Sequence, residues 1–265
     1  MCVSSRSVKK VALVTGGASG IGRAISNRLA KDGFQVAVAD IAREEASQVL
    51  KELHGGRKRH IALGVNIIHK EEVDKAFRKA REAFGQVDVA VANAGITRVT
   101  ALLEQSLEEF RDVQDVNLMG ALHTFRAAAQ TFIDQKTGGK IIAASSIAGH
   151  RPIPYSAAYS ISKSAIVALT QAAAIEWAQH GITVNAYAPG FTQSKMWDVI
   201  DPGYAALGQN EPGSALKKFA SGLSAMQRPG TAEEIAGLVS FLASSDSSYV
   251  TGQTIHADGG THFVS

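Results

Sequence analysis

The chain has 265 residues, with 27 Lys and Arg against 24 Asp and Glu, and a formal net charge of +3. With no stripe of basic residues, this balance excludes the electrostatic footprint of a nucleic-acid-binding protein. The single cysteine, Cys2, excludes an intrachain disulfide and a thiolate metal cluster. The histidines form no HxxxH or HExxH pair, so we expect no metal site. No apolar run approaches the ~18 residues of a membrane span, and we expect a cytoplasmic protein.

Short β-branched runs alternate with helical patterns along the whole chain. We expect strands over 11–14, 35–40, 61–65, 87–92, 140–144, 182–188 and 253–256. Helical patterns fill the intervals, including 43–54, a long helix over 106–135 and another over 158–180. Buried strands that alternate with helices predict an α/β fold, a Rossmann-like doubly wound parallel seven-stranded sheet with helices on both faces.

No linker divides the chain, so we expect one catalytic domain over 9–265, preceded by a short disordered extension over 1–8. The stretch 191–228 breaks the alternation because prolines and glycines interrupt its amphipathic fragments. A long irregular insert in a compact domain is typical of a lid or binding loop. We therefore expect 191–228 to form a substrate lid with little regular structure.

A glycine-rich turn, TGGASGIG at Thr15–Gly22, follows the first strand and opens the first helix. Glycines allow the backbone to approach a pyrophosphate, which binds the free N–H groups of a helix N-terminus. Asp40 ends the second strand, 18 residues after Gly22. A carboxylate at this position is typical of a site that binds the 2′-hydroxyl of the adenosine ribose.

Tyr159 and Lys163 stand four residues apart at the start of the helix over 158–180, so they share one face of it. A nearby ammonium lowers the pKa of a phenol because it favours the tyrosinate. A phenol tuned in this way can donate a proton to a carbonyl or accept one from an alcohol.

In combination, these motifs resemble the short-chain dehydrogenase/reductase family in its single-domain form. The resemblance runs over nearly the whole chain and also includes Asn93–Gly95 (NAG), Asn117, Ser146, the YSISK run that begins at Tyr159, and Pro189-Gly190. It implies four catalytic residues: Tyr159 as general acid/base, Lys163 to hold the nicotinamide ribose and lower the Tyr159 pKa, Ser146 to bond the substrate oxygen, and Asn117 to anchor a water. It implies that the cofactor contacts Gly16, Ser19, Gly20, Ile21, Gly22, Asp40, Ile41, Asn66, Asn93, Ala94, Gly95, Tyr159, Lys163, Pro189, Gly190, Thr192 and Ser194.

The chain departs from the family pattern at three positions. Ala92 replaces the first Asn of Asn-Asn-Ala-Gly, Asn66 replaces an Asp near the adenine, and Ser194 replaces a Thr. None of these changes removes a catalytic group.

Asp40 favours NAD, because a carboxylate accepts bonds from ribose hydroxyls and repels a 2′-phosphate. NADP remains possible, since the Arg43 guanidinium could reach such a phosphate.

The stretches SSIAGH at Ser145–His150 and PGFTQSKMW at Pro189–Trp197, together with Asp201 and the ending YVTGQTIHADGG, look most like acetoin/diacetyl reductases and butanediol dehydrogenases. This resemblance implies a small diketone, acyloin or vicinal diol as substrate. Sugar alcohols, a ketone or polyol of specialised metabolism, a 3-oxoacyl carrier-protein reductase, and a catalytically retired cofactor-binding scaffold stay open. We expect the substrate to contact Ser146, Ile147, His150, Tyr159, Met196 and Trp197, although His150 also fits a solvated loop.

The helix over 158–180 carries two apolar stripes, one with Ile161 and Leu169 and another with Ile166 and Trp177. One stripe can cover the sheet while the other needs a partner. The family resemblance implies the same pairing of helices, and we expect a homotetramer.

Overall fold

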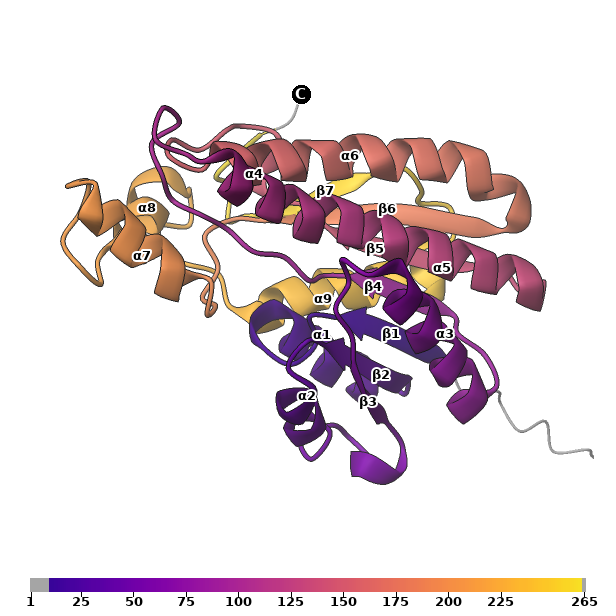
Figure 1. Ribbon diagram of the computed structural model, residues 1–265. Helices are drawn as coiled ribbons and strands as arrows, with labels where there is room; N and C mark the ends of the chain where they lie inside the picture. Colours follow the sequence, from indigo (N-terminus) through magenta and orange to yellow (C-terminus); the bar gives the residue numbers. More distant parts are fainter. Residues whose placement is uncertain (1–9, 264–265) are drawn as a thin grey trace, which may run out of the picture.

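The computed structural model describes residues 10–263, so the expected extension over 1–8 lies outside the described residues. Seven parallel strands form one sheet in the order β3-β2-β1-β4-β5-β6-β7. They are β1 (Val11–Thr15), β2 (Gln35–Asp40), β3 (Ile61–Gly64), β4 (Val89–Ala92), β5 (Gly139–Ala144), β6 (Ile182–Pro189) and β7 (Thr254–Ala257). The doubly wound fold expected from the sequence is confirmed, because helices cover both faces of this sheet (Figure 1).

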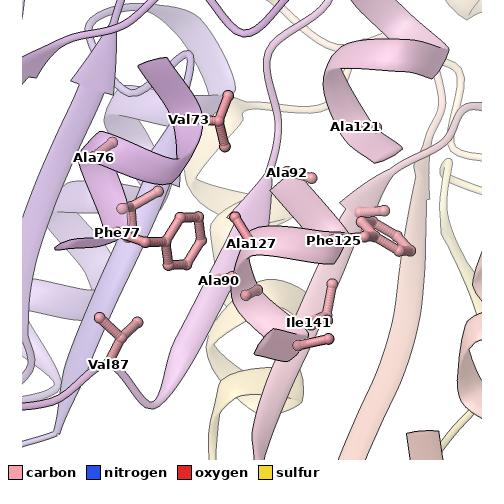
Figure 2. Close-up of a cluster of buried hydrophobic side chains, with 14 of the residues drawn as sticks. Val73, Ala76, Phe77, Val87, Ala90, Ala92, Ala121, Phe125, Ala127 and Ile141 are labelled. Atoms are coloured by element: carbon pink, nitrogen blue, oxygen red, sulfur yellow. The ribbon is translucent and has the colours of Figure 1, made fainter. Parts of the chain in front are cut away.

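One face of the sheet is covered by α3 (Lys70–Phe84), α5 (Gly120–Gln135) and α6 (Ala157–Trp177). Figure 2 shows Phe77 of α3 and Phe125 of α5 in a cluster of buried side chains that also includes Ile141 of β5. Alternate residues of a strand point to opposite faces, so Val11 and Leu13 of β1 pack here. Burial of such a side chain contributes roughly 1.5–3 kcal/mol.

The opposite face is covered by α1 (Gly20–Lys31), α2 (Arg43–Val49) and α9 (Ala232–Ala243). Ile25 of α1 and Val239 of α9 are fully buried against the other set of β1 residues, Ala12 and Val14. A capping box at Thr231 and Glu234 begins α9, with each side chain bonded to the other residue's backbone N–H. These contacts hold α1 and α9 together against this face of the sheet.

Two expected helices are shorter than the sequence patterns suggested. The helix expected over 43–54 ends at Val49, and Gly55 and Gly56, with φ of +98° and +60°, then reverse the chain. The helix expected over 106–135 is divided into α4 (Leu107–Gln114), one π-helical turn (Asp115–Met119) and α5. The hydrophobic pattern continues through the π turn, so the periodicity did not indicate this break.

The expectation of little regular structure over 191–228 is wrong. This segment forms α7 (Trp197–Ala206) and α8 (Ala215–Leu223), which lie together at one end of the molecule (Figure 1). Pro202 is inside α7, although proline interrupts helical hydrogen bonding. Aromatic packing holds both helices, since Phe219 of α8 lies 5.1 Å from Tyr204 of α7 between ring centroids.

No helix within residues 10–263 is long and apolar enough to cross a membrane.

The strand order reverses between β1 and β4, which are neighbours although β2 follows β1 in the chain. In open α/β sheets this switch point forms a crevice at the carboxyl ends of the strands, where ligands bind. The fold therefore places the glycine-rich turn after β1 and the NAG motif after β4 at the same crevice.

Candidate active site

A cavity of about 530 Å³ opens at the carboxyl ends of the strands. Its walls come from the loops that follow β1 to β6, from the start of α6 and from the segment over 191–228. All the residues expected to contact the cofactor line this one cavity: Gly16, Ser19, Gly20, Ile21, Gly22, Asp40, Ile41, Asn66, Asn93, Ala94, Gly95, Tyr159, Lys163, Pro189, Gly190, Thr192 and Ser194.

The glycine-rich turn has the shape that an approaching pyrophosphate requires. Gly16 has a φ of +63°, and a Cβ there would lie 2.8 Å from the Ala94 Cα, so a larger residue would strain the turn. A Cβ on Gly22 would collide with the Gly16 carbonyl. Ser19 caps α1 without a side-chain hydrogen bond, and the first turn of α1 holds no acidic residue. The first N–H groups of α1 are therefore available to an anion, and these residues fit a dinucleotide.

Asp40 lines the cavity at the end of β2. One carboxylate oxygen accepts the Ala18 N–H at 3.0 Å, and the other accepts the Ala42 N–H at 3.0 Å. The carboxylate therefore holds the glycine-rich turn as well as facing the cavity. Arg43 does not line the cavity, and its aliphatic carbons pack beside Gly64 at the end of β3.

Asn93 connects the NAG motif to the glycine-rich turn. Its side-chain amide donates to the Thr15 and Gly16 carbonyls at 3.0 and 3.1 Å, and its side-chain oxygen accepts the Tyr187 hydroxyl at 2.8 Å. Burial raises the pKa of Tyr187, which keeps this hydroxyl a donor. The resulting network fixes two walls of the cavity relative to each other.

Ser146, Tyr159 and Lys163 meet at the cavity because β5 and the start of α6 pack together. Ser146 follows β5 and accepts the Ala148 N–H at 3.1 Å, which leaves its hydroxyl proton free to donate. The Lys163 ammonium donates to the Ala144 carbonyl at 2.8 Å and lies 5.5 Å from the centre of the Tyr159 ring. The spacing of four residues places Tyr159 and Lys163 on one face, as the sequence predicted.

The electrostatic balance at this triad differs from the one expected from sequence. Burial raises the pKa of the Tyr159 phenol, and a hydrogen bond with Ser146 opposes this effect. Burial lowers the pKa of Lys163 to about 8. A lysine with a pKa near 8 stays mostly charged at neutral pH and loses its charge as the pH rises past about 8, so its influence on Tyr159 weakens at alkaline pH. Because burial raises the pKa of Tyr159, the phenol is held in its protonated form, ready to donate.

Asn117 lies in the π-helical turn and is buried behind the cavity rather than at its surface. Its amide nitrogen donates to the Ile96 carbonyl at 2.9 Å and to the Ser162 hydroxyl at 3.0 Å. Its side-chain oxygen accepts the Ile96 N–H at 2.8 Å. These bonds tie the NAG loop to α6 beside Lys163, and the expected role in anchoring a water stays a prediction.

The end of the cavity beyond Tyr159 is lined by apolar and aromatic side chains. Ile147, Met196 and Trp197 line it, as the sequence analysis expected of substrate contacts. The Trp197 indole N–H donates to the Thr192 carbonyl at 2.9 Å, which fixes the ring at the base of the lid. Phe219 and Tyr204 complete an aromatic wall that α7 and α8 supply.

The expectation that His150 contacts the substrate is not supported, since His150 is not among the residues that line the cavity. The 3₁₀ turn over Ile147–Gly149 directs the chain away from Ser146. The His150 ring lies 4.5 Å from His256 of β7 and 6.1 Å from His262 between centroids. Burial lowers the pKa of His150 and of His256.

Within the described residues, no group of His, Cys, Asp or Glu is arranged to hold a metal ion.

Several residues at the substrate end of the cavity could not be identified from sequence. Arg98 on the β4–α4 loop, Tyr204 of α7 and Phe219 of α8 belong to no motif, and they meet only in the folded chain. Arg98 stood three residues after Gly95, and this proximity to a recognised motif was the one signal available. The cavity at this end is also lined by Thr97, Ile153, Ser156, Val199 and Ile200.

Comparisons with known proteins agree with this geometry. A family model described as enoyl-(acyl carrier protein) reductase matches residues 16–262. The chain is 43% identical to an L-2,3-butanediol dehydrogenase of Corynebacterium glutamicum, over 96% of this chain and 98% of that one. It is 42% identical to a diacetyl reductase of Staphylococcus epidermidis that forms (S)-acetoin, with 96% and 98% of the two chains covered.

Solved structures give the same assignment. A short-chain type dehydrogenase/reductase from Mycobacterium marinum superposes with a TM-score of 0.87 at 34% identity, over 97% of both chains. A 3-ketoacyl-(acyl-carrier-protein) reductase from Brucella melitensis, complexed with NADH, superposes with a TM-score of 0.85 at 28% identity, over 97% of this chain and 100% of that one. The chain belongs to the short-chain dehydrogenase/reductase family. It is an oxidoreductase that acts on CH–OH groups with a nicotinamide cofactor.

Proposed function

We propose that the protein interconverts a secondary alcohol and a ketone, prefers NAD(H), and takes a small diketone, acyloin or vicinal diol as its substrate. The observation that carries the reaction is the meeting of Ser146, Tyr159 and Lys163 at the wall of a cavity whose other end fits a dinucleotide. The butanediol dehydrogenase and the diacetyl reductase among the relatives support the substrate class.

Each catalytic side chain has a defined task in this proposal. The bound nicotinamide supplies or accepts the hydride. Ser146 donates its free hydroxyl proton to the substrate oxygen and so orients the carbonyl. Tyr159 gives its phenolic proton to that oxygen during reduction and takes it back during oxidation. Lys163, whose amine lies beside the Tyr159 ring, supports the tyrosinate that remains after proton transfer.

NAD is preferred in this proposal because the one carboxylate that lines the cavity belongs to Asp40, while Arg43 lies outside the lining. The glycine-rich turn and the α1 N-terminus would hold the pyrophosphate. Asn93, Ala94 and Gly95 would border the nicotinamide ribose, since a Cβ on Gly95 would lie 3.4 Å from the Lys163 amine.

The test is a turnover screen with diacetyl, acetoin, polyols, sugars and a 3-oxoacyl thioester, each with NADH or NAD⁺ and with NADPH or NADP⁺. We expect the fastest turnover with diacetyl or acetoin and NADH. Faster reduction of the thioester would support a carrier-protein-linked reductase instead. NADH binding, followed by fluorescence, without turnover of any substrate would identify a cofactor-binding scaffold.

A homotetramer is part of this proposal. Ile166 and Ala173 of α6 are buried against the sheet, whereas Ile161 and Ile175 of the same helix are 51% and 81% exposed. Light scattering at micromolar concentration is expected to give the tetramer mass, and Ile175→Glu is expected to give a smaller species. A monomeric wild-type protein would refute this part. The cytoplasmic location also stays a prediction.

A further inference from the structure

Arg98 occupies a defined place between the catalytic side chains and the lid. It lies on the β4–α4 loop three residues after Gly95, whose Cα faces Asn117 and Lys163. The next residue, Val99, packs against Gly203 of α7 so closely that a Cβ on Gly203 would lie 2.6 Å from the Val99 Cβ. The Thr100 N–H then donates to the Tyr155 carbonyl at 2.8 Å. These contacts fix the loop, and Arg98 lines the cavity at its substrate end.

The Arg98 guanidinium has little to bind within the protein. One of its nitrogens donates to the neighbouring Thr97 carbonyl at 3.1 Å, and Arg98 forms no ion pair with any residue in 10–263. A guanidinium carries five N–H donors in a planar fork. Most of these donors are therefore left for water or for a ligand.

The other charges that line the cavity already have partners. Lys163 is bonded to the Ala144 carbonyl at 2.8 Å, and Lys195 lies 3.9 Å from Glu45 of α2. Asp40 is bonded to two backbone N–H groups at the end of β2, in the part of the cavity next to α2. Arg98 is the cation among apolar and aromatic walls formed by Ile147, Ile153, Met196, Ile200, Tyr204 and Phe219.

We propose that Arg98 is a specificity-determining residue that binds a carboxylate of the substrate. The reacting carbonyl or alcohol would face Ser146 and Tyr159, and the carboxylate would face the guanidinium. A half-buried guanidinium without a counter-charge gains more from a carboxylate than from a neutral oxygen, because the pair is charge-assisted and can be bidentate. The inference rests on the alcohol and ketone chemistry proposed above and adds oxo acids and hydroxy acids to the neutral diketones, acyloins and diols of that proposal.

The test compares oxo acids with their methyl esters, which keep the shape and remove the charge. Acetoacetate, levulinate and the oxo acid one carbon longer are each titrated by calorimetry into the NAD⁺-loaded protein, in which the ketone cannot be reduced, and each is then assayed for turnover with NADH. The proteins are the wild type, Arg98→Leu, Arg98→Lys and the matched control Arg78→Leu, since Arg78 is an exposed arginine of α3. NADH binding and the thermal unfolding midpoint of each variant report whether it is folded.

For at least one chain length, we expect the wild type to bind the acid about 10- to 100-fold more tightly than its ester. This ratio should collapse in Arg98→Leu, take an intermediate value in Arg98→Lys, and remain at the wild-type value in Arg78→Leu. Equal affinity for acid and ester at every length, or a ratio that Arg98→Leu leaves unchanged, would overturn the inference. Acids that bind through Arg98 without turnover of any ketone would refute the proposed reaction and leave the inference standing.

Discussion

The choice of cofactor can be tested at Asp40, whose carboxylate faces the cavity and also accepts two backbone N–H groups. A 2′-phosphate on the adenosine ribose would replace a hydroxyl that donates to this carboxylate. Loss of that bond leaves a partner unpaired at a cost of about 1–3 kcal/mol. Repulsion adds about 1 kcal/mol for each pair of charges at 4 Å, even in bulk water. The sum predicts a preference of at least ~30-fold for NADH over NADPH.

Two substitutions separate the charge of Asp40 from its structural bonds. Asp40→Asn removes the charge and keeps one oxygen that can accept the Ala18 or the Ala42 N–H. Asp40→Ser removes the charge and also shortens the side chain. Both variants should use NADPH better and NADH worse than the wild type. Asp40→Ser should also lose roughly 1–3 kcal/mol of unfolding free energy, because two backbone donors lose a charged acceptor.

The assay is kcat/KM for NADH and NADPH at a fixed ketone concentration, with the thermal unfolding midpoint measured for each variant. Asp40→Asn serves as the control for stability, so that a change in cofactor preference is not mistaken for a loss of folding. A wild-type protein that already prefers NADPH would refute the reasoning. In that case a cation such as Arg43 or Lys195 reaches the phosphate in solution.

Three further outcomes are expected. Tyr159→Phe should lower kcat by about 10²–10⁴-fold because the proton donor is lost, while fluorescence titration shows nearly unchanged NADH affinity; activity within a few-fold of wild type would remove Tyr159 from this role. Amide hydrogen exchange over 191–228 should slow when cofactor and a substrate analogue bind, and equal rates in both states would contradict a lid. Burial lowers the folded-state pKa values of His150 and His256, so the unfolded chain binds more protons and stability should fall as the pH drops below about 6.5. His256→Gln should reduce the difference between unfolding midpoints measured at about pH 7.5 and pH 5.5, and an undiminished difference would exclude this pair as its source.

The sheet and the cofactor end of the cavity could be predicted from sequence because their signals are local. Strands β1, β2, β4 and β6 are short, mostly buried runs rich in Val, Ile and Ala. The glycine-rich turn occupies consecutive positions that the backbone itself requires. Gly16 shows why, since its positive φ and its approach to Ala94 admit no side chain. Because this backbone conformation admits only glycine, a glycine in the sequence at this position in turn indicates the tight turn.

The segment over 191–228 could not be predicted in this way, because its helices α7 and α8 depend on packing rather than on local preference. Pro202 and Gly203 argue against a helix in isolation, yet both lie inside α7. Gly203 is needed there because Val99 of a distant loop occupies the space where a side chain would lie. Tyr204 of the same helix donates to the Pro154 carbonyl at 2.7 Å and packs on Phe219. The tertiary contacts outweigh the local penalty.

The same reasoning explains why the sequence predicts the reaction better than the substrate. Ser146 follows β5 directly, and Tyr159 and Lys163 lie in α6, the next long helix in the chain, so their short spacing in the sequence indicates that they meet. The substrate end instead joins Arg98 of the β4–α4 loop, Phe219 of α8 and the segment after β5, and no spacing links these residues. His150 illustrates the limit, because it stands four residues from Ser146 but packs against His256, 106 residues later, rather than facing the substrate. Residues that line the substrate end therefore have to be located from the folded chain, and Arg98, which forms no ion pair within residues 10–263, is the one for which we propose a role in specificity.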